Sequence, residues 1–225
     1  MEMLDAFKMR LKDILKGKKA AIFDFDGIIV DTEQASVDTA VEVFRLRGAE
    51  LDIADRDDKY GKHDLTYYSE KASKKGVTEK PENLLEEHNR VYDRVVFEIR
   101  EPLPGVRDAV ALVNNLGIVA GICSGSYRYQ IEGILKNIDL QAGFRHITSA
   151  EDTEKHKPYP DPYLAAMKIL GLHPSETVAF EDSRNGVLSA KATGIYVVGV
   201  MIGNHGTQNL QHADVVVHSL LDLLE

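Results

Sequence analysis

Residues 20–27 read AAIFDFDG, a short apolar run that ends in two aspartates and a glycine. A run of this kind predicts a strand that is buried on both faces of a parallel sheet. Asp24 and Asp26 are two residues apart, so both carboxylates point the same way in an extended chain, and Gly27 permits a turn after them. Two like charges at a buried strand end repel each other and need a cation. The alternative is an aspartate pair that only caps the end of a strand.

Further apolar runs later in the chain resemble the first one. They occupy residues 118–123, 146–150, 177–181, 196–200 and 214–217. Helical patterns of apolar residues lie between them, at residues 104–115, 127–137, 160–170 and 185–193. Strands that alternate with helices of this length predict an α/β fold with a Rossmann-like parallel sheet as its core.

Residues 34–100 interrupt the alternation, because they contain almost no strand-like run. Apolar residues recur there at helical spacing in three segments, at residues 37–44, 65–72 and 81–99. This pattern predicts an inserted all-helical cap domain. We therefore expect a cap at residues 33–100 and an α/β core formed by residues 1–32 and 101–225.

The first residues predict an amphipathic helix at residues 1–18 that packs on the core. Its apolar positions fall at helical spacing, at Leu4, Phe7, Leu11 and Ile14. The alternative, an anchor on a membrane surface, is disfavoured because acidic residues dilute the basic face.

Composition restricts the class of protein further. The chain has 225 residues, a formal net charge of −9 and a sequence pI near 5.4. This charge repels nucleic acid and anionic membranes, so we expect neither as a partner. The chain has one cysteine, Cys123, which excludes an intrachain disulfide and is consistent with a cytoplasmic location. We expect a monomer.

Three more polar segments directly follow predicted strands. Cys123-Ser124-Gly125-Ser126 offers hydroxyls and free N–H groups that suit a phosphate, although such a segment is often only a helix cap. Lys157 stands in KPYPDPY, where the following prolines restrict the backbone, although alone it would be a surface lysine. Glu181 and Asp182 follow TVAF, and adjacent acids at a buried strand end favour Mg²⁺ over zinc. Because ligand sites form at the carboxyl ends of parallel strands, we expect these segments to converge.

Taken together, these motifs resemble the haloacid dehalogenase superfamily, and in particular its phosphatases with a helical cap after the first motif. The resemblance rests on DFDG (24–27), VDT (30–32), KPYPDPY (157–163), FEDS (180–183), NG (185–186) and AKATG (190–194), in this order. It covers the chain from about Ala20 to Val217 and leaves out the N-terminal helix. It implies that the chain hydrolyses a small phosphorylated metabolite through an aspartyl-phosphate intermediate.

The resemblance also implies a role for individual residues. Asp24 would be the nucleophile, Asp26 the general acid and base, and Lys157 would neutralise the transferring phosphoryl group. Ser124 and the N–H group of Gly125 would hold the phosphate. The ligands of Mg²⁺ would be Asp24, the backbone carbonyl of Asp26, Asp182 and Glu181.

Three activities remain open at this point. Asp26 favours phosphate esters over dehalogenation, because an alkoxide leaving group needs a proton. A sugar phosphomutase similar to β-phosphoglucomutase is the main alternative to a phosphatase. Ser36 stands where such mutases typically carry a histidine, and Lys62, His63 and Asp64 follow the cap glycine where they carry an arginine. A catalytically inactive phosphate-binding module is the third reading.

Some polar residues carry weaker expectations. His63 and His88 lie on the predicted cap, where they could contact substrate, but we expect them to face solvent. We expect Cys123 to be a core residue rather than a nucleophile. Arg128 either reaches the phosphate or lies on the surface of its helix. Surface positions are expected for His205, His212 and His218, and cap core or cleft lining for Tyr60, Tyr67 and Tyr68.

Overall fold

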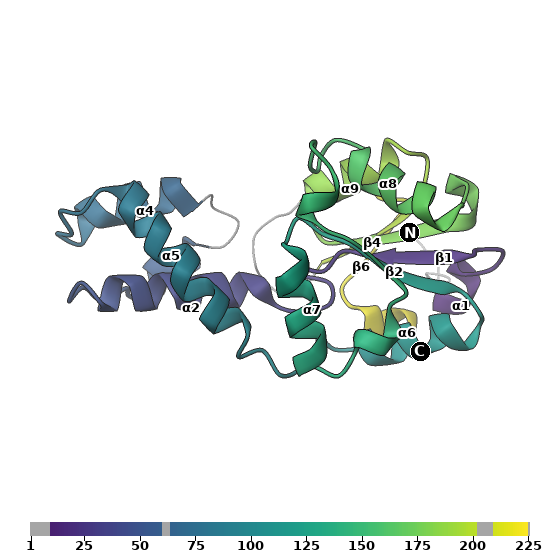
Figure 1. The fold of residues 1–225 in the computed structure, drawn as a ribbon, viewed down its shortest axis with the longest axis horizontal. Coiled ribbons are helices and arrows are strands. Elements are labelled where there is room, and N and C mark those ends of the chain that lie inside the picture. The colour runs from purple at the N-terminus through teal and green to yellow at the C-terminus, as the bar shows by residue number, and fades with distance from the viewer. Residues whose placement is uncertain (1–9, 60–63, 202–208, 225) are drawn as a thin grey trace, which may run out of the picture.

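A computed structural model of the chain describes residues 10–59, 64–201 and 209–224. It confirms the predicted fold class, an α/β protein with a parallel sheet (Figure 1). The six strands are β1 (Ala20–Phe23), β2 (Val119–Cys123), β3 (His146–Thr148), β4 (Thr177–Glu181), β5 (Tyr196–Val200) and β6 (Val215–Val217). Their order is β3-β2-β1-β4-β5-β6, and every neighbouring pair is parallel. The carboxyl ends of β1, β2 and β4 are therefore neighbours.

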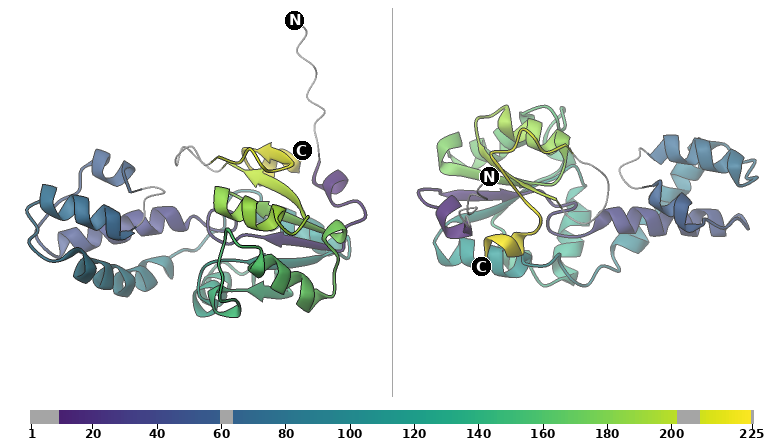
Figure 2. Two further views of the ribbon diagram at one scale, coloured as in Figure 1. Left: turned by 90° about the horizontal axis from the view of Figure 1, so that it is seen from above. Right: turned by 180° about the vertical axis from the view of Figure 1, so that it is seen from behind.

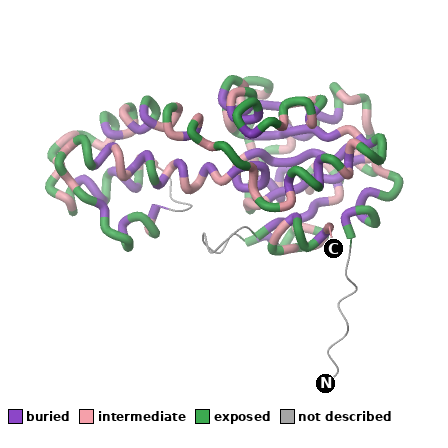
Figure 3. Tube along the Cα trace, turned by 90° about the horizontal axis from the view of Figure 1, so that it is seen from below, coloured by how far each residue is buried: buried purple, intermediate pink, exposed green. Residues whose placement is uncertain are grey.

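Helices cover both faces of the sheet (Figures 1 and 3). On one face lie α1 (Leu11–Ile14), α6 (Val106–Asn115) and α7 (Arg128–Asn137), and on the other lie α8 (Asp161–Leu170) and α9 (Arg184–Lys191). Side chains alternate along each strand, so Ile22 joins the apolar cluster under α8 and α9, while Ala21 and Phe23 join the cluster on the opposite face. Both faces are buried, which explains why the strands read as continuous apolar runs.

The insert between β1 and β2 is helical and forms a lobe beside the sheet in each view (Figures 1 and 2). It contains α2 (Thr32–Arg45), α3 (Ile53–Asp57), α4 (Asp64–Lys74) and α5 (Pro81–Val96). Phe44, Tyr67 and Leu84 belong to an apolar cluster of its own. Tyr67 and Tyr68 are therefore cap core, whereas Tyr60 lies outside the described residues. The division of the chain into domains at residues 32 and 101 stays a prediction.

The interior of the cap contradicts one expectation. His88 is 3% exposed, so the prediction that it faces solvent is wrong. The hydroxyl of Tyr68 lies 2.9 Å from its Nδ1, and the ring stacks on Tyr92 at 5.7 Å. Burial lowers the pKa of His88 to about 4, so the ring is neutral at pH 7 and its burial costs little. His63 lies outside the described residues.

The amino-terminal segment is described only from residue 10. Leu4 and Phe7 lie outside the described residues, so the first half of the predicted helix is not tested. Within the described part of the prediction, α1 covers Leu11–Ile14. Leu11 and Ile14 are buried against the core, as predicted. Among the described residues, no helix is both long and apolar enough to cross a membrane.

Candidate active site

Asp24 begins the segment that leaves β1. Its N–H donates to the carbonyl of Phe180 at 2.9 Å, which keeps this segment beside β4. The residue is 6% exposed, and its Oδ1 accepts the N–H of Phe25 at 2.8 Å. Lys157 Nζ lies 3.0 Å from the same oxygen. The structure thus brings together two residues that are far apart in the chain.

Lys157 reaches the strand ends from the segment before α8. Its Nζ donates to the carbonyl of Cys123 at 2.9 Å and lies 2.7 Å from Oε1 of Glu181. Burial alone would lower the pKa of Lys157, but the carboxylates of Asp24 and Glu181 raise it well above its usual value. The ammonium is therefore a fixed positive charge between the ends of β1, β2 and β4.

Asp26 points toward the segment after β2. Its Oδ2 accepts the hydroxyls of Ser124 at 2.8 Å and Ser126 at 2.7 Å. The N–H of Ser126 donates to Oγ of Ser124 at 2.9 Å, which closes the turn. Gly125 is exposed, and among the residues that the structure describes its N–H has no hydrogen-bond partner. Two hydroxyls thus contact Asp26, and Gly125 lies between them in the chain.

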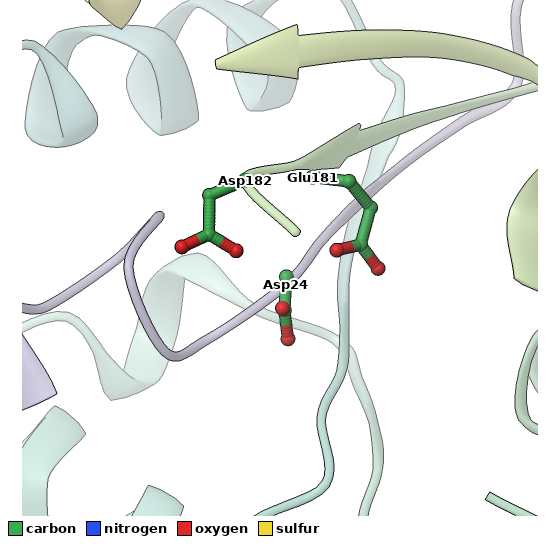
Figure 4. A group of neighbouring side chains, drawn as sticks. All are labelled: Asp24, Glu181 and Asp182. Carbon is green, nitrogen blue, oxygen red and sulfur yellow. The ribbon is translucent and has the colours of Figure 1, made fainter. Parts of the chain in front are cut away.

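Three carboxylates crowd one space beside Asp24 (Figure 4). Glu181 ends β4 and Asp182 follows it, and one oxygen from each of these and from Asp24 lies within 4.8 Å of the others. Burial, and next the charge of Glu181, raise the pKa of Asp24 well above its usual value and the pKa of Asp182 to about 8. The ionised carboxylates are therefore destabilised without a cation between them.

Two glycines make this crowding possible. A Cβ atom on Gly27 would lie 1.9 Å from Oδ2 of Asp182, and one on Gly186 would lie 1.8 Å from Oε2 of Glu181. Neither contact is sterically allowed, so a side chain at either position would have to displace the carboxylate beside it.

The residues present fit a divalent cation. Oε2 of Glu181 is buried and has no hydrogen-bond partner in the described structure, while Oε1 contacts Lys157 and the hydroxyl of Tyr163. A buried carboxylate oxygen without a partner is costly, and a bound cation would satisfy it. Hard oxygen ligands without nitrogen or sulfur suit Mg²⁺.

Sequence reasoning missed two residues of this site. Ser126 was recognised as part of the segment after β2, but its contact with Asp26 was not predicted. Tyr163 ends the KPYPDPY motif, and its hydroxyl donates to Glu181 while its ring lies under the ammonium of Lys157 at 5.5 Å. Position in a shared motif was the available signal for both.

The side chains of the other candidate residues form no hydrogen bond or ion pair with Asp24 or Asp26 among the described residues. Arg128 pairs with Asp152 at 2.7 Å and donates to the carbonyl of Ile147, so it contacts the end of β3. Cys123 is fully buried, and burial raises the pKa of its thiol to about 12, as expected for a core residue. His212 and His218 are exposed, as predicted, and His205 lies outside the described residues.

Comparison with known proteins places this arrangement in a family. The model of the haloacid dehalogenase-like hydrolase family matches residues 21–200. The chain belongs to this family. "Putative phosphatase YhcW" of Bacillus subtilis (strain 168) is 34% identical over 91% of this chain and 93% of that protein. Hexitol phosphatase B of Escherichia coli (strain K12) is 35% identical over 77% of this chain and 79% of its own length.

A solved structure is similar to this chain over nearly its whole length. The β-phosphoglucomutase from Clostridium difficile has a TM-score of 0.70 and 25% identity, and the match covers 92% of this chain and 93% of that chain. Membership of the haloacid dehalogenase-like hydrolases, together with relatives named as phosphatases, makes the chain a phosphatase-type hydrolase.

Proposed function

We propose that this haloacid dehalogenase-like hydrolase removes phosphate from a small phosphorylated metabolite, with Asp24 as nucleophile and Mg²⁺ as cofactor. The observation that carries the proposal is the contact of Asp24 with Lys157 at 3.0 Å, beside the hydroxyls of Ser124 and Ser126. A carboxylate, a buried ammonium group and two hydroxyl donors thus lie at one edge of the sheet, which supports these roles. The phosphatase relatives support the same reaction class.

Charge explains why the cation and Lys157 are needed. A phosphate dianion repels an anionic nucleophile, and Lys157 next to Asp24 offsets part of this repulsion. The residues that would hold Mg²⁺ are Asp24, Glu181, Asp182 and the backbone carbonyl of Asp26. When bound, Mg²⁺ would supply the positive charge that stabilises the oxygens of the transferring phosphoryl group.

Asp24 and Asp26 would divide the chemistry between them. Asp24 attacks phosphorus, the bond to the leaving oxygen breaks, and Asp26 gives that oxygen its proton, which leaves a phosphorylated Asp24. Asp26 then takes a proton from water, which attacks phosphorus and frees Asp24. A phosphate bound by Ser124 and Ser126 would draw their hydroxyls away from Asp26, whose Oδ2 could then carry the proton.

A sugar phosphomutase is the alternative, because the solved relative at 25% identity is one. Ser36 lacks the imidazole that the mutase resemblance calls for, which favours hydrolysis. An inactive phosphate-binding module is disfavoured because Asp24, Asp26 and Lys157 are all present and in contact distance of the same strand ends. The cytoplasmic location and monomeric state stay predictions.

The proposed function is tested with Asp24→Asn against a panel of phosphate esters. The panel contains p-nitrophenyl phosphate, small sugar and acid phosphates, and β-glucose 1-phosphate with its bisphosphate activator. The wild-type protein should release inorganic phosphate, Asp24→Asn should release none, and Asp38→Asn on the exposed side of α2 should match the wild type. Turnover by Asp24→Asn would exclude the covalent mechanism. Conversion of β-glucose 1-phosphate to an isomer without phosphate release would identify a mutase, and no turnover at all a binding module.

A further inference from the structure

The last helix of the cap contacts the core through the carboxylate of Asp93. This residue lies three positions before α5 ends at Val96, and α7 is the core helix beside the lobe (Figure 1). Oδ1 of Asp93 accepts Nε2 of Gln130 at 2.7 Å, and its two oxygens lie 2.9 and 2.8 Å from the hydroxyl of Tyr129. Burial, and next the hydrogen bond with Asp93, raise the pKa of Tyr129 to about 12, so this hydroxyl keeps its proton and donates. Asp93 is therefore the acceptor in each contact.

Gln130 joins this contact to the segment after β2. The residue is 9% exposed, and its Oε1 accepts the N–H of Tyr127 at 3.2 Å. A carboxylate accepts hydrogen bonds, whereas an amide has a donor at one end and an acceptor at the other. Asp93 therefore selects the orientation in which the NH₂ group of Gln130 faces the cap and its carbonyl oxygen faces Tyr127. A reversed amide would turn its NH₂ group toward an N–H group, and Tyr127 would lose this hydrogen bond.

Tyr127 stands between the turn at residues 124–126 and α7. The two serine hydroxyls of this turn contact Asp26 at 2.8 and 2.7 Å. A fixed N–H of Tyr127 limits where Ser126, the residue before it, can lie. From the side of β3, the carbonyl of Ser126 accepts the N–H of Ala150 at 3.0 Å. The turn is therefore held by the core on one side and by the cap, through the amide, on the other.

The same two helices meet a second time, further from the turn. Nδ2 of Asn137, the last residue of α7, donates to the carbonyl of Phe97 at 2.8 Å. The ring of Phe97 lies over Gly133, where a Cβ atom would clash with it. Asn137 is seven residues beyond Gln130, about 10 Å along the helix. This contact attaches α5 to α7 as the first one does, but it does not reach the turn.

We propose that Asp93 and Gln130 are positioning residues of the phosphate site. Asp93 orients the amide of Gln130, and this amide holds the turn at residues 124–126 in the place where it would bind phosphate. The cap thereby contributes to phosphate affinity through α7 rather than by contact with the phosphate itself. This inference rests on the proposed phosphatase function.

Inhibition of p-nitrophenyl phosphate hydrolysis by inorganic phosphate tests this inference. The inhibition constant Ki is a property of the folded enzyme, so partial loss of folded protein does not change it. Gln130→Met keeps the length of the side chain and removes both hydrogen bonds without a change of charge. Gln130→Glu keeps the acceptor for Tyr127 but sets a second carboxylate against Asp93. In the double variant with Asp93→Asn, the amide at position 93 can donate to the carboxylate at position 130.

Gln130→Met should raise Ki about fivefold, the effect of one hydrogen bond that places the turn. Gln130→Glu should raise it at least as much, because the two carboxylates repel each other. The double variant should return Ki to within about twofold of the wild type. The matched control is Asn137→Ala, which should lower the free energy of unfolding in urea but keep the wild-type Ki.

Three results would overturn the inference while leaving the proposed function intact. The first is a wild-type Ki in Gln130→Met. The second is a rise in Asn137→Ala as large as that in Gln130→Met, because attachment of the helices alone would then explain both. The third is a double variant that binds phosphate no better than Gln130→Glu, because Asp93 would then not act through the amide. Absence of turnover by the wild type on every ester would overturn the proposed function itself, and this inference with it.

Discussion

Replacing Gly27 with alanine should separate the geometry of the site from the stability of the fold. Gly27 has φ of +77°, and a Cβ atom built on it would lie 1.9 Å from Oδ2 of Asp182. Real Cβ contacts are essentially never below 3.0 Å, so the Asp182 carboxylate would have to move by about 1 Å. A misplacement of about 1 Å in a reacting site can cost about 100-fold in rate.

A second glycine provides a matched control. Gly17 lies before β1 as Gly27 lies after it, has φ of +76°, and has no atom within 4 Å of a Cβ built on it. Left-handed backbone costs a residue other than glycine about 1–2 kcal/mol. Both variants should therefore lose about 1–2 kcal/mol of free energy of unfolding, since they share this backbone cost. Asp182 should be displaced only in Gly27→Ala.

The assay combines urea unfolding with phosphate release from p-nitrophenyl phosphate at saturating Mg²⁺. We expect Gly17→Ala to keep wild-type turnover and Gly27→Ala to lose about 100-fold, although both unfold at similar urea concentrations. Turnover by Gly27→Ala within about threefold of Gly17→Ala would refute the reasoning, because it would show that the placement of Asp182 does not limit the reaction. A much larger loss of free energy of unfolding in Gly27→Ala than in Gly17→Ala would show that the clash displaces the backbone rather than the side chain of Asp182.

Three further outcomes are expected. Excess chelator should abolish phosphate release and added Mg²⁺ should restore it, so full activity in chelator would remove the metal from the proposal. Asp26→Asn should give a burst of nitrophenol from p-nitrophenyl phosphate and then stall with Asp24 phosphorylated. The reason is that nitrophenolate leaves without a proton, whereas the attacking water still needs a base. Rapid-quench kinetics without a burst would contradict this role of Asp26. His88, which faces Asp64 and Lys59, has its pKa lowered by burial from 6.5 to about 4, so the unfolded chain binds the proton more tightly. The free energy of unfolding should fall by up to about 3 kcal/mol between pH 6.5 and 4, and a wild type with the same pH slope as His88→Gln in urea unfolding would exclude this.

The fold was predictable because its four central strands, β1, β2, β4 and β5, are buried on both faces. Every predicted strand overlaps an observed one. A strand buried in a parallel sheet shows as an apolar run in its own sequence, so it can be predicted without knowing which strands lie beside it. The missed element is α3, whose sequence IADRD has no apolar stripe. This helix depends on the cap at Asp52 and on Asp55, which is fully buried among Lys71, Lys74 and Lys75. Tertiary ion pairs of this kind leave no periodic signal in the sequence.

The candidate site was predictable in part, for the same topological reason. Residues that follow adjacent parallel strands must meet at one edge, and Asp24, Ser124 and Asp182 follow β1, β2 and β4. The contacts of Tyr163 and His88 depend instead on how a helix packs against its neighbours. A histidine is polar and is expected at the surface from sequence alone. The burial of His88 is explained by its contact with the hydroxyl of Tyr68 and its stacking on the ring of Tyr92.

The candidate active site and the cap differ in how far their buried charges are paired. In the core, Lys157 is the one cation that the described residues place in contact with Asp24 and Glu181, and Asp182 lies beside them. Negative charge therefore remains in excess, and the carboxylates are destabilised until a metal joins them. In the described part of the cap, Lys59 pairs with the carboxylate of Asp64, so these two charges balance each other without any ligand. A site with net charge attracts ions, whereas a site without net charge favours groups that both donate and accept hydrogen bonds. The excess of negative charge in the core would therefore favour a cation and the phosphate it binds, whereas the Lys59–Asp64 pair adds no net charge of its own.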